Sequence, residues 1–171
     1  MPENSFSHEY RPELLSRRAE LIVWVLALIV GITWLILVLT NATVHRSVPF
    51  MTGFLVLVGL GMSLANWMDR RTHIKTDQEG IVFTNGLRHT QLAWEDIRKV
   101  EVFPSNWGKK VRVYGAKAYF EFRTLAEVKV DGQIKGRMGF PAGEIILDQI
   151  LDAANLKETE HTDSGYYYTR E

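Results

Sequence analysis

The chain has 171 residues, with 20 Lys and Arg against 20 Asp and Glu, a formal net charge of zero, and no cysteine. A chain without cysteine cannot form disulfides, thiolate metal sites or cysteine nucleophiles. Neutrality argues against a nucleic-acid-binding protein, because such proteins normally carry a strongly basic domain. The distribution of residues along the chain is therefore more informative than the totals.

Two apolar runs, residues 21–40 and 48–68, contain no Asp, Glu, Lys or Arg and are separated only by residues 41–47. A transmembrane helix needs about 20 apolar residues to cross a hydrocarbon core about 30 Å thick. In lipid every backbone N–H and C=O must be paired internally, so each run is predicted to be a continuous helix. Together the runs predict a two-helix transmembrane hairpin over residues 19–69.

The positive charges that flank the two runs predict the orientation of this hairpin. The first run is preceded by Arg11, Arg17 and Arg18, and the second run is followed by Arg70, Arg71 and Lys75. The connecting loop carries only two basic residues, His45 and Arg46. The positive-inside rule therefore places both chain ends in the cytoplasm and the loop outside. The sequence predicts a protein of the cell inner (plasma) membrane with a cytoplasmic N-terminal segment, residues 1–18.

The second run carries small residues at helical spacing. Gly59, Gly61, Ser63 and Ala65 form two overlapping pairs in which the members lie four residues apart. Such pairs let helix backbones approach closely, which drives helix association in lipid. Two interpretations follow. This face packs against the first helix of the same chain, which the short loop favours, or it binds transmembrane helices of a protein partner or of a second copy.

After residue 71 the pattern changes to short segments rich in Val, Ile, Phe, Tyr and Thr, which are typical of strands. The predicted strands are residues 72–76, 81–84, 87–92, 98–103, 111–114 and 117–125, with a further hairpin that joins 127–130 to 134–140. The Asn85-Gly86 pair is a strong hairpin signal, so consecutive strands are expected to be antiparallel. In the last of the six strands, Phe120 and Phe122 are predicted to face the core and the alternate residues to face solvent.

A C-terminal helix is predicted after Pro141, because apolar residues recur there at three- and four-residue spacing: Ile146, Leu147, Ile150, Leu151 and Ala154. About seven antiparallel strands closed at one end by one amphipathic helix is the organisation of a pleckstrin-homology-like barrel, which periodicity alone leaves as one of several options. The fold class is therefore expected to be α+β, with a strand-rich domain over residues 70–156.

The last segment, residues 157–171, is polar and contains three adjacent tyrosines, Tyr166, Tyr167 and Tyr168. Such a composition cannot build a core and predicts a disordered tail unless the segment docks on something else. Adjacent tyrosines in a tail also fit a short docking peptide for a partner. An ordered terminus would accordingly suggest an assembly.

Two short motifs carry a family resemblance. Residues 76–81 read Thr-Asp-Gln-Glu-Gly-Ile, and residues 92–100 contain Trp94, Glu95, Asp96 and Ile97 in succession. Both resemble the bacterial pleckstrin-homology domains of small membrane proteins, in which a glycine-aliphatic turn opens the second strand and Trp-x-Asp-Ile bridges the third and fourth strands. The resemblance covers residues 72–156 and, with the preceding hairpin, implies an antiparallel barrel capped by a C-terminal helix. Independently of it, Trp94 and Ile97 are apolar residues expected to plug one barrel end.

No catalytic, cofactor-binding or metal-binding residues are predicted. The histidines lie in separate segments without the spacing of a metal site: His8, His45, His73, His89 and His161. The sequence also lacks a recognisable nucleophile with an adjacent base, so we do not expect an enzyme.

The candidate binding surface is cationic and consists of Trp107, Lys109, Lys110 and Arg112, around the predicted loop 104–110. Basic residues near a membrane gain about 1 kcal/mol each from anionic lipid, so the lipid bilayer is one predicted partner. A protein partner is another, and a solvated hairpin tip is the third interpretation. The sequence thus favours a membrane-anchored, non-enzymatic binding or scaffold module at the cytoplasmic face. The alternative is an accessory subunit of a larger membrane complex.

Overall fold

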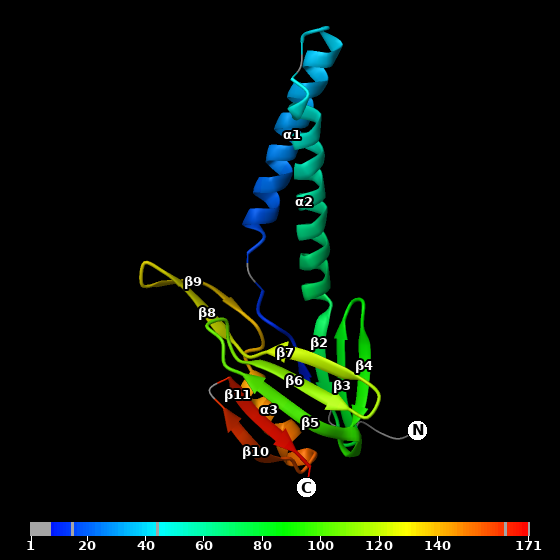
Figure 1. Ribbon diagram of the computed structural model, residues 1–171, viewed down its shortest axis with the longest axis vertical. Coiled ribbons are helices and arrows are strands. Elements are labelled where there is room, and N and C mark those ends of the chain that lie inside the picture. The colour runs from blue at the N-terminus through cyan, green and yellow to red at the C-terminus, as the bar shows by residue number, and fades with distance from the viewer. Residues whose placement is uncertain (1–7, 15, 44, 163, 171) are drawn as a thin grey trace. The chain divides into compact units, whose positions relative to one another are not determined.

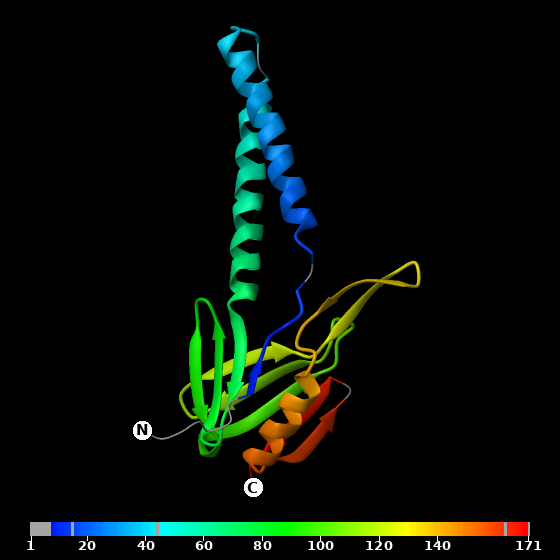
Figure 2. The ribbon, with the colours of Figure 1, turned by 180° about the vertical axis from the view of Figure 1, so that it is seen from behind.

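The computed structural model describes residues 8–14, 16–43, 45–162 and 164–170 (Figure 1). The chain divides into two compact units. One is a helical hairpin, Ser16–Met68, and the other is a strand-rich domain that combines Met1–Leu15 with Asp69–Glu171. Figure 2 shows both units from behind, with the C-terminal helix and strands in orange and red.

The helical hairpin consists of α1 (Arg18–Leu39) and α2 (Ser47–Arg70), both long and apolar enough to cross a membrane. At about 1.5 Å per residue, the 22 residues of α1 extend about 33 Å, which matches the hydrocarbon thickness of a bilayer. Most of their large apolar side chains are exposed, including Leu39 at 72% and Phe50 at 79%. The two predicted helices are therefore confirmed, and their apolar outer surface suits lipid rather than water.

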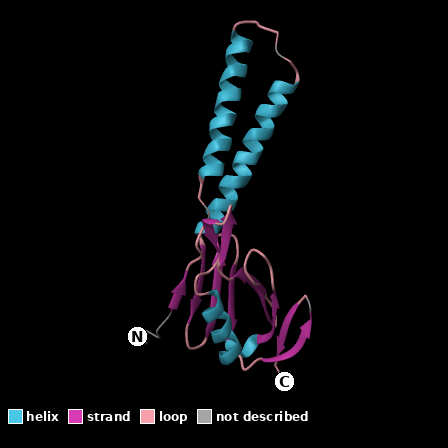
Figure 3. Ribbon diagram, turned by 90° about the vertical axis from the view of Figure 1, so that its left-hand side faces the viewer, coloured by secondary structure: helices cyan, strands magenta, loops and turns pink. Residues whose placement is uncertain are grey.

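The strand-rich domain contains antiparallel sheets, drawn in magenta in Figure 3. The four-stranded sheet has the order β1 (His8–Tyr10), β2 (Thr72–Thr76), β3 (Gly80–Asn85) and β4 (His89–Ala93). The five-stranded sheet has the order β10 (Lys157–Thr162), β11 (Gly165–Thr169), β5 (Ile97–Phe103), β6 (Lys110–Gly115) and β7 (Tyr119–Arg123). A separate hairpin joins β8 (Ala126–Val130) and β9 (Gln133–Met138).

The core is built from the alternate side chains of the two larger sheets and from one face of α3 (Gly143–Ala153). Ile146 and Ile150 of α3 are fully buried, as are the two valines of β6. Burying one such side chain contributes about 1.5–3 kcal/mol. The predicted inward orientation of Phe120 and Phe122 is confirmed, because they are 2% and 4% exposed.

Trp94 plugs the core, as the sequence predicts. It opens the short 3₁₀ turn η1 (Trp94–Asp96), is 9% exposed, and donates a hydrogen bond from Nε1 to the backbone oxygen of Asp77 at 3.1 Å. The Asp77 carboxylate accepts the backbone N–H groups of Glu79 and Gly80 at 2.9 and 2.8 Å, which fixes the β2–β3 turn. A Cβ on Gly80 would lie 2.2 Å from the backbone oxygen of Leu92, so only glycine fits. The two sequence motifs therefore form one structural unit.

The sheets do not close into a barrel, which corrects the closed barrel expected from the sequence. Among the described strands, β4 and β7 each stand at the end of a sheet. Closure between β4 and β5 would need the second edge of β5, and β11 occupies that edge. Tyr166 pairs there with Val102, and Tyr168 pairs with Val100. The C-terminal hairpin thus takes the place of the contact that would close the barrel.

The C-terminal segment is docked on its own domain rather than disordered. Tyr166 and Tyr168 of β11 are half-buried and pack against the core. Arg170 then donates hydrogen bonds from its guanidinium to the backbone oxygens of Glu95, Trp94 and Ala154 at 2.8, 3.0 and 2.9 Å. The polar composition of the segment predicted disorder, because the apolar contacts that order it come from β5 and not from the segment itself. These tyrosines therefore serve the fold, and they are not a free docking peptide.

Residues 8–14 lie in the strand-rich domain. In the β1–β2 pair, His8 lies opposite Thr76 and Tyr10 lies opposite Ile74. Glu13 exchanges two backbone hydrogen bonds with Gly139, at 2.7 and 3.2 Å. The described residues near each terminus, 8–14 and 164–170, therefore contact their own domain. The helical hairpin is an insertion between two neighbouring strands of one sheet.

Candidate functional site

A cavity of about 360 Å³ opens beside β7. We call it the edge pocket, and its lining comes from four strands and the β3–β4 turn: Phe83, Asn85, Arg88, Thr90, Lys110, Arg112, Tyr119, Phe120 and Glu121. Ligand sites usually have volumes of about 300–1,000 Å³. The edge pocket is therefore large enough to receive a small group or part of a larger ligand.

The edge pocket lies against the free edge of β7. Phe120 points into the core, whereas Tyr119 and Glu121 point to the opposite, exposed side of the sheet. A cavity that touches both faces of one strand must reach round the edge of that strand, and β7 is the last strand of its sheet. The core side of the pocket is aromatic, because the rings of Phe83 and Phe120 stack with their centres 5.2 Å apart.

The outer side of the edge pocket is cationic. Glu121 Oε2 lies 3.0 Å from Lys110 Nζ and 3.1 Å from Arg112 Nε. The Arg88 guanidinium lies over the ring of Tyr119, 5.8 Å from its centre, in a cation–π arrangement. Three cations thus line the pocket with one carboxylate. The excess of positive charge is complementary to an anionic ligand.

Competing effects determine the charge of Glu121. Partial burial raises the pKa of its carboxyl group, but the hydrogen bonds from Lys110 and Arg112 outweigh burial and lower the pKa below its ordinary value. The hydrogen bond with Glu121 in turn raises the pKa of Arg112. Both shifts favour the charged forms of Glu121 and Arg112.

The structure separates the four residues of the predicted cationic surface. Lys110 and Arg112 line the edge pocket, whereas Lys109 Nζ forms an ion pair with Glu144 Oε2 of α3 at 3.0 Å. Trp107 is 51% exposed in the loop between β5 and β6 and does not line the pocket. Side chains alternate along a strand, so Lys110 and Arg112 lie on the outer face of β6, and Val111 between them in sequence is fully buried on the core face.

Sequence reasoning did not identify Arg88, Tyr119 and Glu121 as parts of the site. The alternation in residues 117–125 had already assigned positions 119 and 121 to the solvent face, and a hairpin signal preceded Arg88. The missing information was non-local, because the β3–β4 turn meets β7 only after the two sheets have packed. The stacked pair of phenylalanines between the sheets is the contact that brings these residues together.

The small residues of α2 divide between two faces. A Cβ on Gly59 would lie 3.0 Å from the ring of Trp24, and Ser63 Oγ accepts a hydrogen bond from Trp24 Nε1 at 3.0 Å. In contrast, Gly61 and Ala65 are exposed, and a Cβ on Gly61 would meet no atom within 4 Å. One pair therefore packs against the first helix of the same chain, and the other pair leaves room for a further helix.

A carboxylate connects the two helices of the hairpin. Glu20 of α1 accepts hydrogen bonds from Ser63 Oγ at 2.6 Å and from Asn66 Nδ2 at 2.7 Å, and it lies 3.3 Å from Arg17 Nε. Hydrogen bonds between transmembrane helices contribute about 0.6–2 kcal/mol each. This network fixes how α1 and α2 pair.

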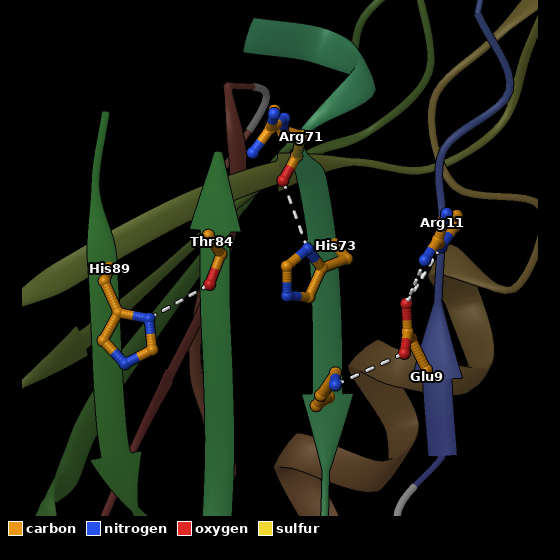
Figure 4. A network of polar contacts seen from close by, with 7 residues as sticks. Glu9, Arg11, Arg71, His73, Thr84 and His89 are labelled. Atoms are coloured by element: carbon orange, nitrogen blue, oxygen red, sulfur yellow. Dashed lines mark hydrogen bonds and ion pairs between the residues drawn. The ribbon is translucent and has the colours of Figure 1, made fainter. Parts of the chain in front are cut away.

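The histidines of the four-stranded sheet make local hydrogen bonds. His73 Nδ1 lies 3.1 Å from the backbone oxygen of Arg71, and His89 Nδ1 lies 3.1 Å from Thr84 Oγ1. Figure 4 marks both contacts with dashed lines. Within the described parts of the chain, no three His, Cys, Asp or Glu side chains are grouped closely enough to hold a metal ion. The edge pocket is therefore the stronger candidate for a ligand site.

No protein-family model, curated protein or solved structure matches this chain. The resemblance to bacterial pleckstrin-homology domains consequently rests on the motifs in residues 76–81 and 92–100. The edge pocket, with its geometry and charge, is the main basis for a functional proposal.

Proposed function

We propose that this protein is a membrane-anchored, non-enzymatic binding module whose edge pocket captures an anionic group of its ligand. The helical hairpin holds the chain in the inner (plasma) membrane, and the strand-rich domain, with a pleckstrin-homology-like organisation, lies in the cytoplasm. The observation that carries the proposal is the presence of Arg88, Lys110 and Arg112 with a single carboxylate in a cavity at an open sheet edge.

Two observations support the membrane anchor and its orientation. The outer surfaces of α1 and α2 are apolar and exposed, and the basic residues of the sequence cluster before and after the hairpin. In addition, β1 precedes the hairpin and β2 follows it, and the two strands pair in one sheet. This pairing supports a topology in which both ends of the hairpin lie on the same side of the membrane.

The chemistry of the edge pocket supports an anionic ligand. A carboxylate or phosphate group can take over the hydrogen bonds that Lys110 and Arg112 now donate to Glu121, and Arg88 adds a further cation. Hydrogen bonds to charged groups contribute about 1.5–3 kcal/mol each. The aromatic core side of the pocket adds apolar contact next to the cations.

The test uses the full chain in phosphatidylcholine nanodiscs, titrated with fluorescently labelled hexaglutamate. Replacing Arg88, Lys110 and Arg112 together by Gln should weaken binding at least about tenfold, or about 1.4 kcal/mol. Added salt should also weaken binding, because it screens the attraction. Arg98→Gln is the matched control, since Arg98 is an exposed cation of β5 outside the pocket. Equal affinities of the triple variant and the control would contradict the proposal.

A second candidate function is an accessory subunit of a larger membrane complex. The observation that favours it is the exposed pair Gly61 and Ala65, which no side chain of α1 covers. Gentle detergent extraction followed by affinity purification and mass spectrometry tests this role. A stoichiometric partner that is lost in Gly61→Leu but kept in Phe54→Leu supports it, because Phe54 is exposed on α2 without being a close-packing residue. Recovery of the chain alone contradicts it.

A further inference from the structure

Among the described strands, β7 pairs only with β6, so one of its edges beside the edge pocket presents backbone hydrogen-bonding groups without a strand partner. Thr124 N donates to Lys109 O at 2.9 Å, and Gly115 N donates to Ala118 O at 2.8 Å. In an antiparallel pair, alternate residues of a strand direct their N–H and C=O groups toward the partner strand. Even-numbered residues of β7 therefore face β6, and the backbone groups of Tyr119 and Glu121 face away from it.

One end of this edge is already occupied. Phe140 N donates to Arg123 O at 2.9 Å, and Thr124 forms an isolated parallel bridge with Phe140. The open part of the edge is therefore the segment from Tyr119 to Glu121. This is the same segment that lines the cavity, so the free backbone groups and the pocket coincide.

The two sides of the edge pocket differ in chemistry across the plane of the sheet. The outer side carries Arg88, Lys110 and Arg112, and the core side carries Phe83 and Phe120. Successive side chains of a strand point to opposite faces of its sheet. A strand added to β7 would thus direct every second side chain toward the cations and the others toward the phenylalanine rings.

We infer that the ligand of the edge pocket is an extended peptide segment of a partner protein, in which acidic and apolar residues alternate. The segment adds a strand to the free edge of β7 at Tyr119 and Glu121. Main-chain hydrogen bonds supply affinity in this recognition mode, and pockets for alternate side chains supply specificity. The inference rests on the proposed function, because it names the partner class for the same pocket.

The first experiment compares two capped peptides of about seven residues, a usual strand length. One alternates valine and glutamate, and the other has the same composition arranged in two blocks. Both are titrated against the full chain in phosphatidylcholine nanodiscs, with hexaglutamate as the reference anion. We expect the alternating peptide to bind at least tenfold more tightly than the block peptide. Its binding should also slow hydrogen exchange at the amides of Tyr119 and Glu121.

A matched pair of variants isolates the backbone contribution. Glu121→Pro and Glu121→Ala both remove the carboxylate, but only the first removes the N–H group at the free edge. Proline is tolerated on an edge strand whose N–H points away from its neighbour, so the β6–β7 pairing should survive. We expect Glu121→Pro to weaken binding of the alternating peptide at least tenfold relative to Glu121→Ala. An alternating peptide that carries N-methyl groups on its pairing edge should lose affinity for the wild-type chain in the same way.

The outcomes separate the two proposals. If hexaglutamate binds through the cations but the alternating and block peptides bind equally, the anion site stands and strand addition is refuted. Equal affinity of the proline and alanine variants for the alternating peptide, together with no loss on N-methylation, refutes strand addition as well. Binding of soluble short-chain phosphatidylglycerol that displaces hexaglutamate and is insensitive to Glu121→Pro would assign the pocket to a lipid headgroup instead. If none of these probes binds, both proposals fail.

Discussion

Replacing Trp94 by alanine should remove a large fraction of the stability of the strand-rich domain. Trp94 is 9% exposed and lies in the hydrophobic core cluster, so nearly all of its side-chain contacts are internal. Truncating a buried aromatic side chain costs about 3–5 kcal/mol. The variant also loses the hydrogen bond from Nε1 to Asp77 O, which adds about 1 kcal/mol. A domain usually has only about 5–15 kcal/mol of stability, so the loss is a large fraction of the total.

Limited proteolysis of the full chain in nanodiscs measures this effect. When opening and reclosing are fast relative to cleavage, the rate of cleavage follows the population of the open form. A loss of at least about 3 kcal/mol raises that population more than a hundredfold, because each 1.4 kcal/mol corresponds to a factor of ten. Tyr119→Ala is the control, since Tyr119 is 48% exposed and surface substitutions usually change stability by about 0.5 kcal/mol or less. Equal cleavage rates for the two variants would refute the assignment of Trp94 to the core.

Three further predictions follow from the hairpin, its orientation and an acidic side chain. Gly59→Leu should weaken the pairing of α1 and α2, because a Cβ at position 59 would already lie 3.0 Å from the Trp24 ring, whereas Gly61→Leu should not. The two variants are compared by thermal aggregation of the detergent-solubilised chain. Similar midpoint temperatures would contradict the packing of Gly59 against Trp24. Because the chain has no cysteine, Asp131→Cys and Thr43→Cys each introduce a single labelling site. In intact cells a membrane-impermeant reagent should label only the cysteine at position 43. Labelling at position 131 instead would show that the predicted orientation is wrong. Burial raises the pKa of Glu101, but hydrogen bonds from Lys99 and Tyr114 outweigh burial and lower the pKa, so its stabilising contribution is present above the ordinary pKa and is lost as pH falls through the lowered one. Glu101→Gln should therefore lose less thermal stability than the wild-type chain between neutral and strongly acidic pH, and parallel curves would show that Glu101 contributes nothing.

Local patterns predicted the elements of this chain well. The apolar runs gave both long helices, and the alternation of Phe120 and Phe122 with polar neighbours gave the inward face of β7. These features follow from residues close together in sequence. Trp94 was also assigned to the core, because a large apolar ring in an otherwise polar turn is more stable when it packs against the hydrophobic core than when it is exposed to water.

The arrangement of the edges could not be predicted in the same way. The C-terminal hairpin has a polar composition, and its order depends on a long-range partner, β5, that no local pattern specifies. The same contact leaves the barrel open and creates the free edge at β7. The edge pocket was missed for the same reason, since Arg88 lies in the β3–β4 turn and Glu121 lies on β7, and the two come together only when the sheets pack.

The position of the helical hairpin between β1 and β2 links the proposed membrane insertion to the order in which the domain folds. Roughly sixty residues separate the two strands, so at about 5–20 residues per second the ribosome needs several seconds between them. During that interval β2, the strand that pairs with β1, has not yet been made. In the proposed topology, the four-stranded sheet forms only after α2 has crossed back to the side from which α1 departed. A chain in which only one helix crossed the membrane would have β1 and β2 on opposite sides of the bilayer, where they could not pair. In the proposed topology, a completed β1–β2 pair therefore requires that both helices have crossed the membrane.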